Sequence, residues 1–460
     1  MNLPIYERYT KSNILWVGNY PSEWFITKVK YEAYVKARVG WHGLKSDDFT
    51  DEGPFLVTGS DFKSSRIQWA DCYHCDLNRY EQDPYIQLRN GDLLITKDGT
   101  IGKVALVDGL KTNDKATLNS GVFVVRPLIN NFSTRFYFWL LQSKVFTDFV
   151  DYNKTGSTIV HLYQDTFVNF SYASPQLKEQ LQIAAFLDHE TTKIDNLIAK
   201  QQQLIELLKE KRQAVISHAV TKGLNPHVPM KDSGVEWLGE VPEHWDVAKL
   251  SFKYEVLLGK MLDDKKITGK YLGRYLRNTD VQWDSINTEE LPLMDFRPEE
   301  RERFSIKKGD LVVCEGGEIG RSAIWNTDDP CFYQKALHRL RPLSNNNKTR
   351  FMFYVLYDAV KQGRFISGAG KATIAHLPAE SFRQYKFGFP PLTEQVDIAT
   401  TLDSYSQLFD KLEEKTVQQI ALLQERRTAL ISAAVTGKID VRDWVAPDTQ
   451  DVEEPQEATA

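Results

Sequence analysis

Residues 175–221 read PQLKEQLQIAAFLDHETTKIDNLIAKQQQLIELLKEKRQAVISHAVT, and residues 390–436 read PPLTEQVDIATTLDSYSQLFDKLEEKTVQQIALLQERRTALISAAVT. Aligned at a constant offset of 215, the two stretches are identical at 23 of 47 positions. Average composition would give roughly three identities by chance. The chain therefore contains an internal duplication, and the rest of the sequence is arranged around it.

Both copies carry apolar residues at the spacing of a long helix. In the first copy these residues fall at alternating steps of three and four, once two polar positions are admitted: Ile194, Leu197, Leu204, Leu208 and Val215. No Gly or Pro lies between residues 193 and 222, so about 27 residues at a rise of 1.5 Å predict a rod of about 40 Å. A rod cannot bury its apolar stripe alone. We therefore expect the two copies to pack as an antiparallel coiled coil about a pseudo-two-fold axis. Two unrelated surface helices fit less well, because surface helices are normally shorter.

The duplication extends beyond the helices. A Trp-x-Gly-x-x-Pro-x-x-Trp frame at residues 16–24 returns at residues 237–245, and the stretch from Gly91 to Gly102 returns at residues 309–320. The chain thus consists of two repeated units, and the sequences between the shared anchors differ.

Each unit also has the pattern of a mixed globule. Short apolar, β-branched runs bounded by Gly, Asp and Asn predict strands at residues 55–58, 93–96, 104–107, 122–125, 311–313 and 322–325. Helical patterning covers residues 135–146 and 350–361. We predict an α+β fold with a pseudo-two-fold internal repeat. Its parts are a globule at 1–180, a long helix at 181–222, a linker at 223–232, a second globule at 233–395, a second long helix at 396–440 and an acidic, disordered tail at 441–460.

The composition is that of an ordinary globular protein, with 42% hydrophobic and 26% charged residues. The formal charge of −5 lies entirely in the last twenty residues, where Arg442 is outnumbered by six acids, so the other 440 residues are formally neutral. Neutrality neither supports nor excludes DNA binding, because local clusters of Lys and Arg decide that. The longest apolar runs are too short to span a membrane and the N-terminus has no secretory pattern, so we expect a cytoplasmic protein.

Residues for catalysis, metal binding or cofactor binding do not stand out. The pair Cys72 and Cys75 has the spacing of a zinc knuckle, but Cys314 and Cys331 supply no second pair, and we predict no metal site. No Asn/Asp-Pro-Pro-Tyr/Phe loop of a base-modifying methyltransferase is present. The Gly-rich run at residues 368–371 lacks the flanking residues of a phosphate loop. We therefore predict no catalytic residues and no cofactor.

The loops are the better candidates for function. The two hairpins at residues 91–103 and 309–321 share their glycines but differ in the polar residues between them. A purely structural hairpin remains an alternative, because glycines with positive φ are needed at such turns whatever their function. A fixed turn that carries variable donors and acceptors nevertheless suits recognition. Arg, Asn, Gln and Lys read base edges, whereas Ser, Thr and Lys commonly hold phosphates.

On this reasoning the candidate DNA-binding residues come from the loops that differ between the two units. In the first unit they are Lys97, Thr100, Lys103, Asn119, Ser120, Lys154, Ser157 and Thr158. In the second they are Arg277, Asn278, Glu315, Glu318, Arg321, Gln334, Lys335, His338, Lys371 and Thr373. His161 and His376 match each other across the repeat, so we expect them to be structural.

Two variable globules that alternate with two similar long helices resemble the specificity subunit of type I restriction-modification systems. The residues that carry the resemblance are the frame at 237–245, the Leu-x-Glu-Gln starts at 177–180 and 392–395, and the stretch from Gly91 to Gly102. The frame at 16–24 is a less regular copy. The resemblance implies that each globule is a target recognition domain reading half of a bipartite, asymmetric site in double-stranded DNA. It also implies that the helices set the gap and dock methyltransferase subunits, two in number, alongside restriction/translocase subunits.

The resemblance further implies a non-catalytic subunit, with S-adenosylmethionine and ATP on partner subunits only. Two other functions stay open at this stage. A self-contained DNA modification enzyme would need a cofactor site, and a coiled-coil scaffold would leave two differing globules unexplained.

Overall fold

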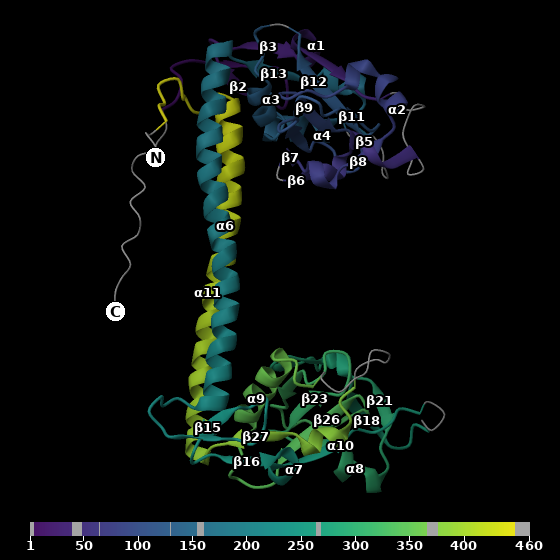
Figure 1. Ribbon diagram of the computed structural model, residues 1–460, viewed down its shortest axis with the longest axis vertical. Helices are drawn as coiled ribbons and strands as arrows, with labels where there is room; N and C mark the ends of the chain where they lie inside the picture. The colour runs from purple at the N-terminus through teal and green to yellow at the C-terminus, as the bar shows by residue number, and fades with distance from the viewer. Residues whose placement is uncertain are drawn as a thin grey trace. The chain divides into compact units, whose positions relative to one another are not determined.

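The computed structural model describes residues 4–38, 48–63, 65–128, 130–153, 161–263, 268–365 and 376–446. The chain divides into two compact units (Figure 1). Unit 1 comprises residues 1–201 and 418–460, and unit 2 comprises residues 202–417. Each unit therefore combines one globule with a part of both long helices.

The duplicated stretches form the helices α6 (Leu177–Lys222) and α11 (Leu392–Val435). They contain 46 and 44 residues, so both are longer than the rod predicted from the sequence, and α6 measures about 69 Å at 1.5 Å per residue. The extra turns lie at the N-terminal ends, where Ile183 and Ile398 are completely buried against the globules. Their apolar positions serve the globule rather than the helix pair, which is why the periodicity of the pair did not reveal them.

The helices pack on each other inside unit 1. Leu187 of α6 shares a core with Val435 of α11, and the Nε of Arg427 donates to the Asp195 carboxylate at 2.8 Å. Rising residue numbers in α6 thus meet falling numbers in α11, so the two segments are antiparallel, as predicted. The predicted stripe is buried only in part, because Ile194 is buried whereas Leu197 and Leu204 are exposed.

Unit 2 repeats this contact with the roles of the helices exchanged. Arg212 of α6 donates to Asp410 of α11 at 2.5 Å, and Ile216 and Leu402 lie in one core. Arg212 and Asp410 stand at the positions of Arg427 and Asp195 in the duplicated stretch. The helix pair is therefore pseudo-symmetric at the level of single ion pairs.

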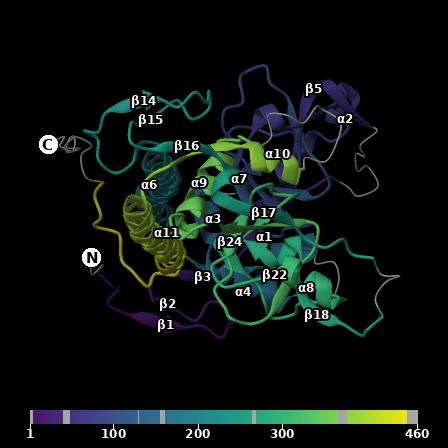
Figure 2. The ribbon, with the colours of Figure 1, turned by 90° about the horizontal axis from the view of Figure 1, so that it is seen from below.

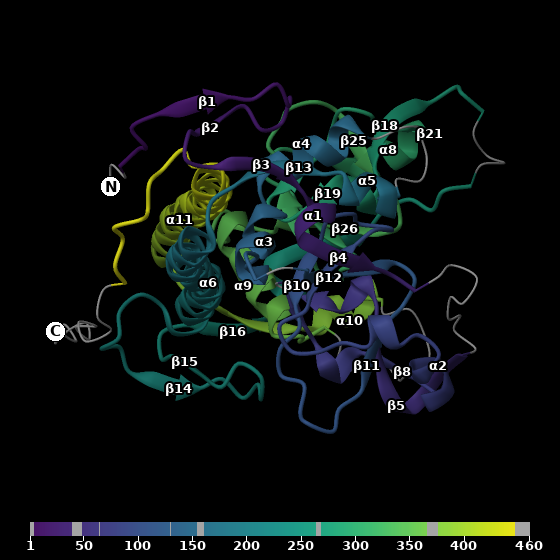
Figure 3. The ribbon, with the colours of Figure 1, turned by 90° about the horizontal axis from the view of Figure 1, so that it is seen from above.

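The globule of unit 1 contains a six-stranded sheet with the order β4-β12-β9-β10-β7-β6 and a three-stranded sheet with the order β11-β5-β8. Helix α3 lies between the long helices and the larger sheet (Figure 3). The predicted strands at 55–58, 93–96, 104–107 and 122–125 correspond to β5, β9, β10 and β12. The elements are β1 Tyr9–Lys11, β2 Asn19–Pro21, β3 Phe25–Lys28, α1 Val29–Glu32, β4 Ala33–Lys36, β5 Phe49–Val57, β6 Phe62–Lys63, β7 Arg66–Ile67, β8 Tyr73–Cys75, α2 Leu77–Glu81, β9 Leu93–Thr96, β10 Val104–Leu106, β11 Ala116–Leu118, β12 Val122–Pro127, α3 Thr134–Leu140, α4 Lys144–Tyr152, α5 Gln164–Val168 and β13 Ser171–Ser174.

The globule of unit 2 contains two four-stranded sheets, with the orders β17-β26-β23-β24 and β21-β18-β25-β22. Helix α9 lies between the long helices and the first of these sheets (Figure 2). The predicted strands at 311–313 and 322–325 correspond to β23 and β24, and the predicted helix at 350–361 to α9. The elements are β14 Met230–Asp232, β15 Glu240–Pro242, β16 Asp246–Lys249, α7 Leu250–Lys253, β17 Tyr254–Leu258, β18 Leu272–Leu276, β19 Val281–Gln282, β20 Ser285–Ile286, β21 Leu293–Asp295, α8 Pro298–Phe304, β22 Ser305–Ile306, β23 Leu311–Cys314, β24 Ser322–Ile324, β25 Cys331–Tyr333, β26 Leu337–Pro342, α9 Thr349–Lys361, α10 Ala379–Gln384 and β27 Lys386–Phe389.

One predicted helix is divided in two. Residues 135–146 cover all but the first residue of α3 and the first three residues of α4, with a break at residues 141–143. The Ser143 hydroxyl donates to the Leu140 carbonyl at 2.7 Å, and the Ser143 amide bonds to the same carbonyl at 3.1 Å. Such local side-chain bonds compete with the helical ladder, which explains the break.

A glutamine at the start of each long helix holds the adjacent globule. The Gln180 side chain accepts from the Ser133 amide at 2.9 Å and donates to the carbonyl of Asn131 at 3.1 Å and of Pro175 at 3.0 Å. Gln395 makes the same three bonds, to Lys348 at 2.7 Å, Asn346 at 3.1 Å and Pro390 at 2.8 Å. Both glutamines are buried. The recurrence of this residue in the two Leu-x-Glu-Gln starts therefore reflects a structural anchor.

The glutamate of the same motif explains the Trp frame. The indole of Trp24 donates to Glu179 at 3.0 Å, and the indole of Trp245 donates to Glu394 at 3.1 Å. The last Trp of each frame therefore ties the start of its globule to the start of a long helix.

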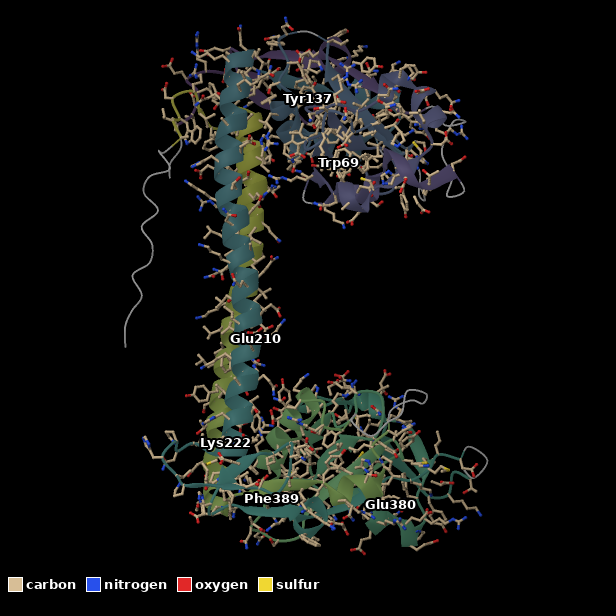
Figure 4. The ribbon with its side chains drawn as sticks, viewed as in Figure 1. Trp69, Tyr137, Glu210, Lys222, Glu380 and Phe389 are labelled. Atoms are coloured by element: carbon tan, nitrogen blue, oxygen red, sulfur yellow. The ribbon has the colours of Figure 1, made fainter. Side chains whose placement is uncertain are left out.

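A third repeated anchor lies about two turns further along each helix. Arg135 donates to Asp188 at 2.8 Å in unit 1, and Arg350 donates to Asp403 at 2.7 Å in unit 2. Tyr137, labelled in Figure 4, belongs to the same helix as Arg135 and lies in the buried core of unit 1. The globules are thus fastened to the helices by contacts that the duplication preserves.

Residues 441–446, the first part of the predicted tail, pack on unit 1. Val441 is buried, and the Trp444 ring lies 5.4 Å from Phe186 between ring centroids. The rest of the predicted acidic tail, residues 447–460, lies outside the described residues. Among the described residues, no helix is long and apolar enough to cross a membrane.

Candidate nucleic-acid interface

The loop between β9 and β10 in unit 1 has a backbone fixed by its own strand end. The Thr96 hydroxyl donates to the Thr100 carbonyl and accepts from the Lys103 amide at 3.0 Å. Gly102 has a φ of 81°, and a Cβ there would lie 3.3 Å from the Phe146 ring. Gly102 is therefore needed for the structure of the turn, as the alternative of a structural hairpin also requires. The side chains of Thr100 and Lys103 are exposed.

A second predicted loop lies against the first. The Lys97 amide donates to the Gly121 carbonyl at 2.9 Å, which joins the β9–β10 loop to residues 119–121 between β11 and β12. The Asn119 amide donates to Val57 at 2.9 Å, at the end of β5. Lys97, Asn119 and Ser120 are half-buried. Two separate stretches of sequence thus place their variable polar residues together.

His161 closes the same site from a third direction. Its Nδ1 lies 2.5 Å from the Asp98 carboxylate, and the next residue, Leu162, donates its amide to the Lys97 carbonyl at 2.9 Å. His161 therefore anchors its segment to the β9–β10 loop, which is the structural role expected of it.

Unit 2 assembles its loops by the corresponding backbone contacts. The Glu315 amide donates to the Ala336 carbonyl at 2.9 Å, so the β23–β24 loop meets residues 334–336 between β25 and β26. The Leu377 amide donates to the Glu315 carbonyl at 2.8 Å, and His376 forms a backbone bridge with Gly316. The two units therefore share one loop scaffold.

Three of the predicted residues in unit 2 bond chiefly to this scaffold. The Asn278 amide group donates to the Gly316 carbonyl at 2.8 Å, and Arg321 donates to the Asn278 side-chain oxygen at 3.0 Å. Glu318 accepts from the Trp283 indole at 2.8 Å. These contacts hold the β23–β24 loop in place, so Asn278, Arg321 and Glu318 shape the site as well as line it.

The other predicted residues of unit 2 differ in how accessible they are. Lys335 is exposed, whereas Gln334 and Glu315 are half-buried. Burial raises the pKa of Glu315, and the nearby His376 and Lys335 oppose that rise. Arg277 bonds to the Asp280 carboxylate at 2.7 Å in the turn that precedes β19. Lys335 is thus the most freely presented cation among these residues.

The prediction that His338 binds DNA is wrong, because this side chain is buried. It lies within β26 with no exposed surface, and its Nε2 is 2.8 Å from the Leu377 carbonyl. Burial lowers its pKa to about 4, so the ring is neutral near pH 7. Phe123 occupies the matching position in unit 1 and is also buried. The difference between Phe and His at this position therefore reflects the core and not the surface.

Five further candidates lie outside the described residues. Lys154, Ser157 and Thr158 fall in residues 154–160, and Lys371 and Thr373 fall in residues 366–375 together with the Gly-rich run.

The cysteines form no site among the residues that the structure describes. All four are buried, and no group of three His, Cys, Asp or Glu side chains is placed to hold a metal ion. Cys72 and Cys75 lie in the core of unit 1, and burial raises the pKa of the Cys72 thiol to about 12.

The sequence did not point to the hairpin formed by β19 and β20, whose tip residues Trp283 and Asp284 adjoin the β23–β24 loop. The Asp284 amide donates to the Ser322 carbonyl at 3.1 Å, next to Arg321. Two-residue strands leave no periodic pattern, so a single sequence offers only the isolated Trp as a signal.

The chain matches known proteins along most of its length. A model of the type I restriction modification DNA specificity domain matches residues 45–207 and 255–422. The type I restriction enzyme MjaVIII specificity subunit of Methanocaldococcus jannaschii is 24% identical over 371 residues, which are 78% of this chain and 81% of the relative. The type I restriction enzyme EcoBI specificity subunit of Escherichia coli is 22% identical over 372 residues, 77% of this chain and 75% of the relative.

Solved structures share the fold. A chain in a structure concerned with complex assembly and conformational transition of the type I R-M system has a TM-score of 0.67 and 16% identity, and covers 90% of this chain and 98% of its own. The HsdS subunit from Thermoanaerobacter tengcongensis has a TM-score of 0.58 and 16% identity, covering 91% of this chain and 98% of its own.

Proposed function

The chain belongs to the type I restriction modification DNA specificity family, and on that premise we propose that each of its units reads one half of an asymmetric, bipartite DNA site. As a DNA specificity subunit of a type I system, the chain is the non-catalytic component of its complex, and the cofactors reside on the modification and restriction subunits.

One observation carries the proposal: the units repeat their scaffold contact by contact but present different side chains from it. The backbone bonds that join the two loops are the same in both units, yet Asn119-Ser120-Gly121 in unit 1 stands where Gln334-Lys335-Ala336 stands in unit 2. Lys97 similarly stands where Glu315 does. Base edges in the major groove are told apart by the donors and acceptors that side chains offer. Different side chains on a common frame should therefore select different bases.

The described candidates that we propose for this role are the accessible ones. In unit 1 they are Lys97, Thr100, Lys103, Asn119 and Ser120. In unit 2 they are Arg277, Asn278, Glu315, Glu318, Arg321, Gln334 and Lys335. Exposed Thr100, Lys103 and Lys335 are the best placed to meet phosphates or base edges without prior rearrangement.

We propose that the long helices set the gap between the half-sites and dock two methyltransferase subunits, with restriction/translocase subunits completing the complex. Exposed leucines on the helices recur at matching positions, Leu197 with Leu412 and Leu207 with Leu422. Unit 1 holds Leu197 and Leu422, and unit 2 holds Leu412 and Leu207. Each unit thus offers the same pair of apolar side chains, which supports two copies of one partner. Such a complex would act where chromosomal DNA lies, in the cytoplasm.

A loop exchange tests the division of recognition. Asn119→Gln, Ser120→Lys and Gly121→Ala together give unit 1 the loop of unit 2, and the added Cβ at residue 121 meets only Asp98 side-chain atoms at 3.7 Å. The complex with its methyltransferase subunits is assayed for methylation of DNA carrying randomised half-sites. We expect altered selection at one half-site and none at the other. The reverse exchange in unit 2 should alter the second half-site alone.

Equal changes at both half-sites, or no change at either, would contradict the proposal. A self-contained modification enzyme would instead methylate DNA without added methyltransferase subunits, and a scaffold would support no sequence-dependent methylation in any combination.

A further inference from the structure

The tip of the β19–β20 hairpin in unit 2 has an unusual backbone. Asp284 has a φ of 59°, one of two such non-glycine residues that the described part of the chain contains. Residues other than Gly adopt this left-handed conformation only when their surroundings hold them there, although Asp tolerates it better than most. The contacts of Asp284 therefore hold its backbone in this conformation.

Asp284 reaches toward the long helix through an arginine. Its carboxylate forms two contacts with the Arg350 guanidinium, the second at 2.7 Å from the other oxygen. Arg350 of α9 also donates to Asp403 of α11 at 2.7 Å. Burial would lower the pKa of Arg350, but the hydrogen bonds that its guanidinium donates to Asp284 and Asp403 raise it above its ordinary value. The guanidinium is thus a fixed cation shared between the hairpin and the helix.

The neighbouring residue, Trp283, contacts both α9 and the β23–β24 loop, residues 315–321, which we call the recognition loop. The Trp283 indole donates to Glu318 of the recognition loop at 2.8 Å. Its ring lies 4.9 Å from the Tyr357 ring of α9, and the ammonium of Lys361, the last residue of α9, lies 5.8 Å from the ring centre. The turn before the hairpin also contacts this loop, because Asn278 bonds to Gly316 and Arg321. The hairpin therefore contacts the recognition loop through Trp283, packs on α9 through the same ring, and bonds to Arg350 of the helix anchor through Asp284.

Unit 1 has the hairpin but not the link. Its hairpin β6–β7 has Ser65 at the tip with a φ of 61°, in the same register. Serine has no carboxylate to meet an arginine. The corresponding Arg135 bonds to Asp188 of α6, and its side chain is 41% exposed against 21% for Arg350. Among the described residues, the hairpin tie is thus a property of unit 2 alone.

We propose that Asp284 is a positioning residue for DNA recognition by unit 2: it tethers the β19–β20 hairpin, and with it the β23–β24 loop, to the α9–α11 anchor. This inference rests on the proposed function of the two units. Its consequence is that base discrimination at one half-site depends on a residue whose side chain bonds to the helix anchor and not to the DNA, whereas discrimination at the other half-site depends on no such tie.

Three variants separate the tether from the turn. Asp284→Gly keeps the left-handed turn, since Gly adopts positive φ freely, but removes both contacts to Arg350. Asp284→Asn also tolerates the turn and keeps one neutral acceptor for Arg350, so it is the partial rescue. Ser65→Gly makes the same backbone change in unit 1, where the tip residue has no carboxylate, and is the matched control.

The test uses the full chain in its complex with methyltransferase subunits and a DNA duplex carrying the recognised site, with single base-pair changes in one half or the other. We expect Asp284→Gly to reduce discrimination at the half read by unit 2 by about three- to tenfold, the size typical of residues that act through coupling. Discrimination at the other half should stay at the wild-type level, Asp284→Asn should lie between the two, and Ser65→Gly should change neither half.

Unchanged discrimination by Asp284→Gly, or an equal loss at both halves, would overturn the inference. Thermal unfolding of each variant shows whether unit 2 is still folded. A loss of discrimination at one half-site alone, in a variant that is folded, cannot come from general destabilisation. The wild-type complex serves as the check on the underlying function. If the wild-type complex does not recognise two separate half-sites, the proposed function is wrong. If it recognises both and Asp284→Gly leaves discrimination unchanged, the proposed function stands and only the role of Asp284 is wrong.

Discussion

Replacing Gln395 with Ala should destabilise unit 2 strongly, because this residue joins the globule to α11 through three hydrogen bonds. Its side chain is 1% exposed, and no water can replace the lost partners without entering the core. Each bond contributes about 1 kcal/mol net, and buried groups left unpaired add a cost of about 1 to 3 kcal/mol. The stranded groups are the Lys348 amide and the carbonyls of Asn346 and Pro390. We therefore expect a loss of about 3 to 5 kcal/mol.

Scanning calorimetry of the full chain measures this loss. For a unit of this size, 1 kcal/mol lowers Tm by about 2 to 4 °C, so the unit 2 transition should fall by about 6 to 20 °C. Gln180→Ala should have a matching effect on the unit 1 transition and little on unit 2. Gln395→Glu keeps the acceptor for the Lys348 amide but places a buried carboxylate oxygen against the carbonyls of Asn346 and Pro390, and at pH 7 should destabilise unit 2 at least as much as Gln395→Ala. A change below about 0.5 kcal/mol, the usual size for a surface substitution, would refute the view that this residue fastens the globule.

Three other variants probe the recognition loop, the helices and the core. Lys335→Ala should weaken selection at one half-site by about 1 to 3 kcal/mol, measured as relative methylation of single-substitution duplexes, and an equal effect at both halves would mean that it acts through folding. Inserting four residues into both long helices, between residues 200 and 206 and between 415 and 421, lengthens each helix by about 6 Å. At about 3.4 Å per base pair, methylation mapping should show a gap that is wider by one or two base pairs, with both half-sites unchanged. An unchanged gap would exclude the helices as spacer. His338→Phe should make unit 2 less sensitive to acid, because the buried His338 stays neutral down to about pH 4 while the same residue in the unfolded chain binds a proton near pH 6.5. The free energy of unfolding of the wild-type unit 2 should therefore fall by up to about 3 kcal/mol as the pH drops from 6.5 to 4. The difference in free energy of unfolding between pH 7 and pH 5 should be smaller for the variant than for the wild type.

Much of the architecture is readable from the sequence, because the duplication acts as an internal alignment. A residue that recurs at a constant offset, such as Gln180 with Gln395, is marked as common to both units. The pairing of the long helices can be inferred in the same way, since each stripe has only one partner of equal length. The roles of the repeated residues cannot be inferred from the sequence. Which backbone groups a glutamine bonds to depends on how the loop at residues 131–133 folds back, and that is a tertiary property.

The candidate site was predictable in its outline and not in its detail. Loops that differ between the units, at residues 97–103 and 119–121, meet in space because β9, which precedes the first loop, pairs with β12, which follows the second. His338 was misplaced because a strand residue that differs between two units is indistinguishable, in one sequence, from a loop residue that differs. The β19–β20 hairpin escaped notice because its strands are two residues long. Only the fold shows that Asp284, far from the loop residues in sequence, adjoins them.

The central claim is that unit 1 and unit 2 each read one half of the DNA site. The most direct measurement maps methylated positions in the genome of a cell that carries this chain with its methyltransferase, and repeats the map after residues 1–180 are replaced by those of another family member. The claim predicts that one block of the recognised sequence changes while the other block and the gap stay the same. A map in which both blocks change, or in which neither does, would contradict it.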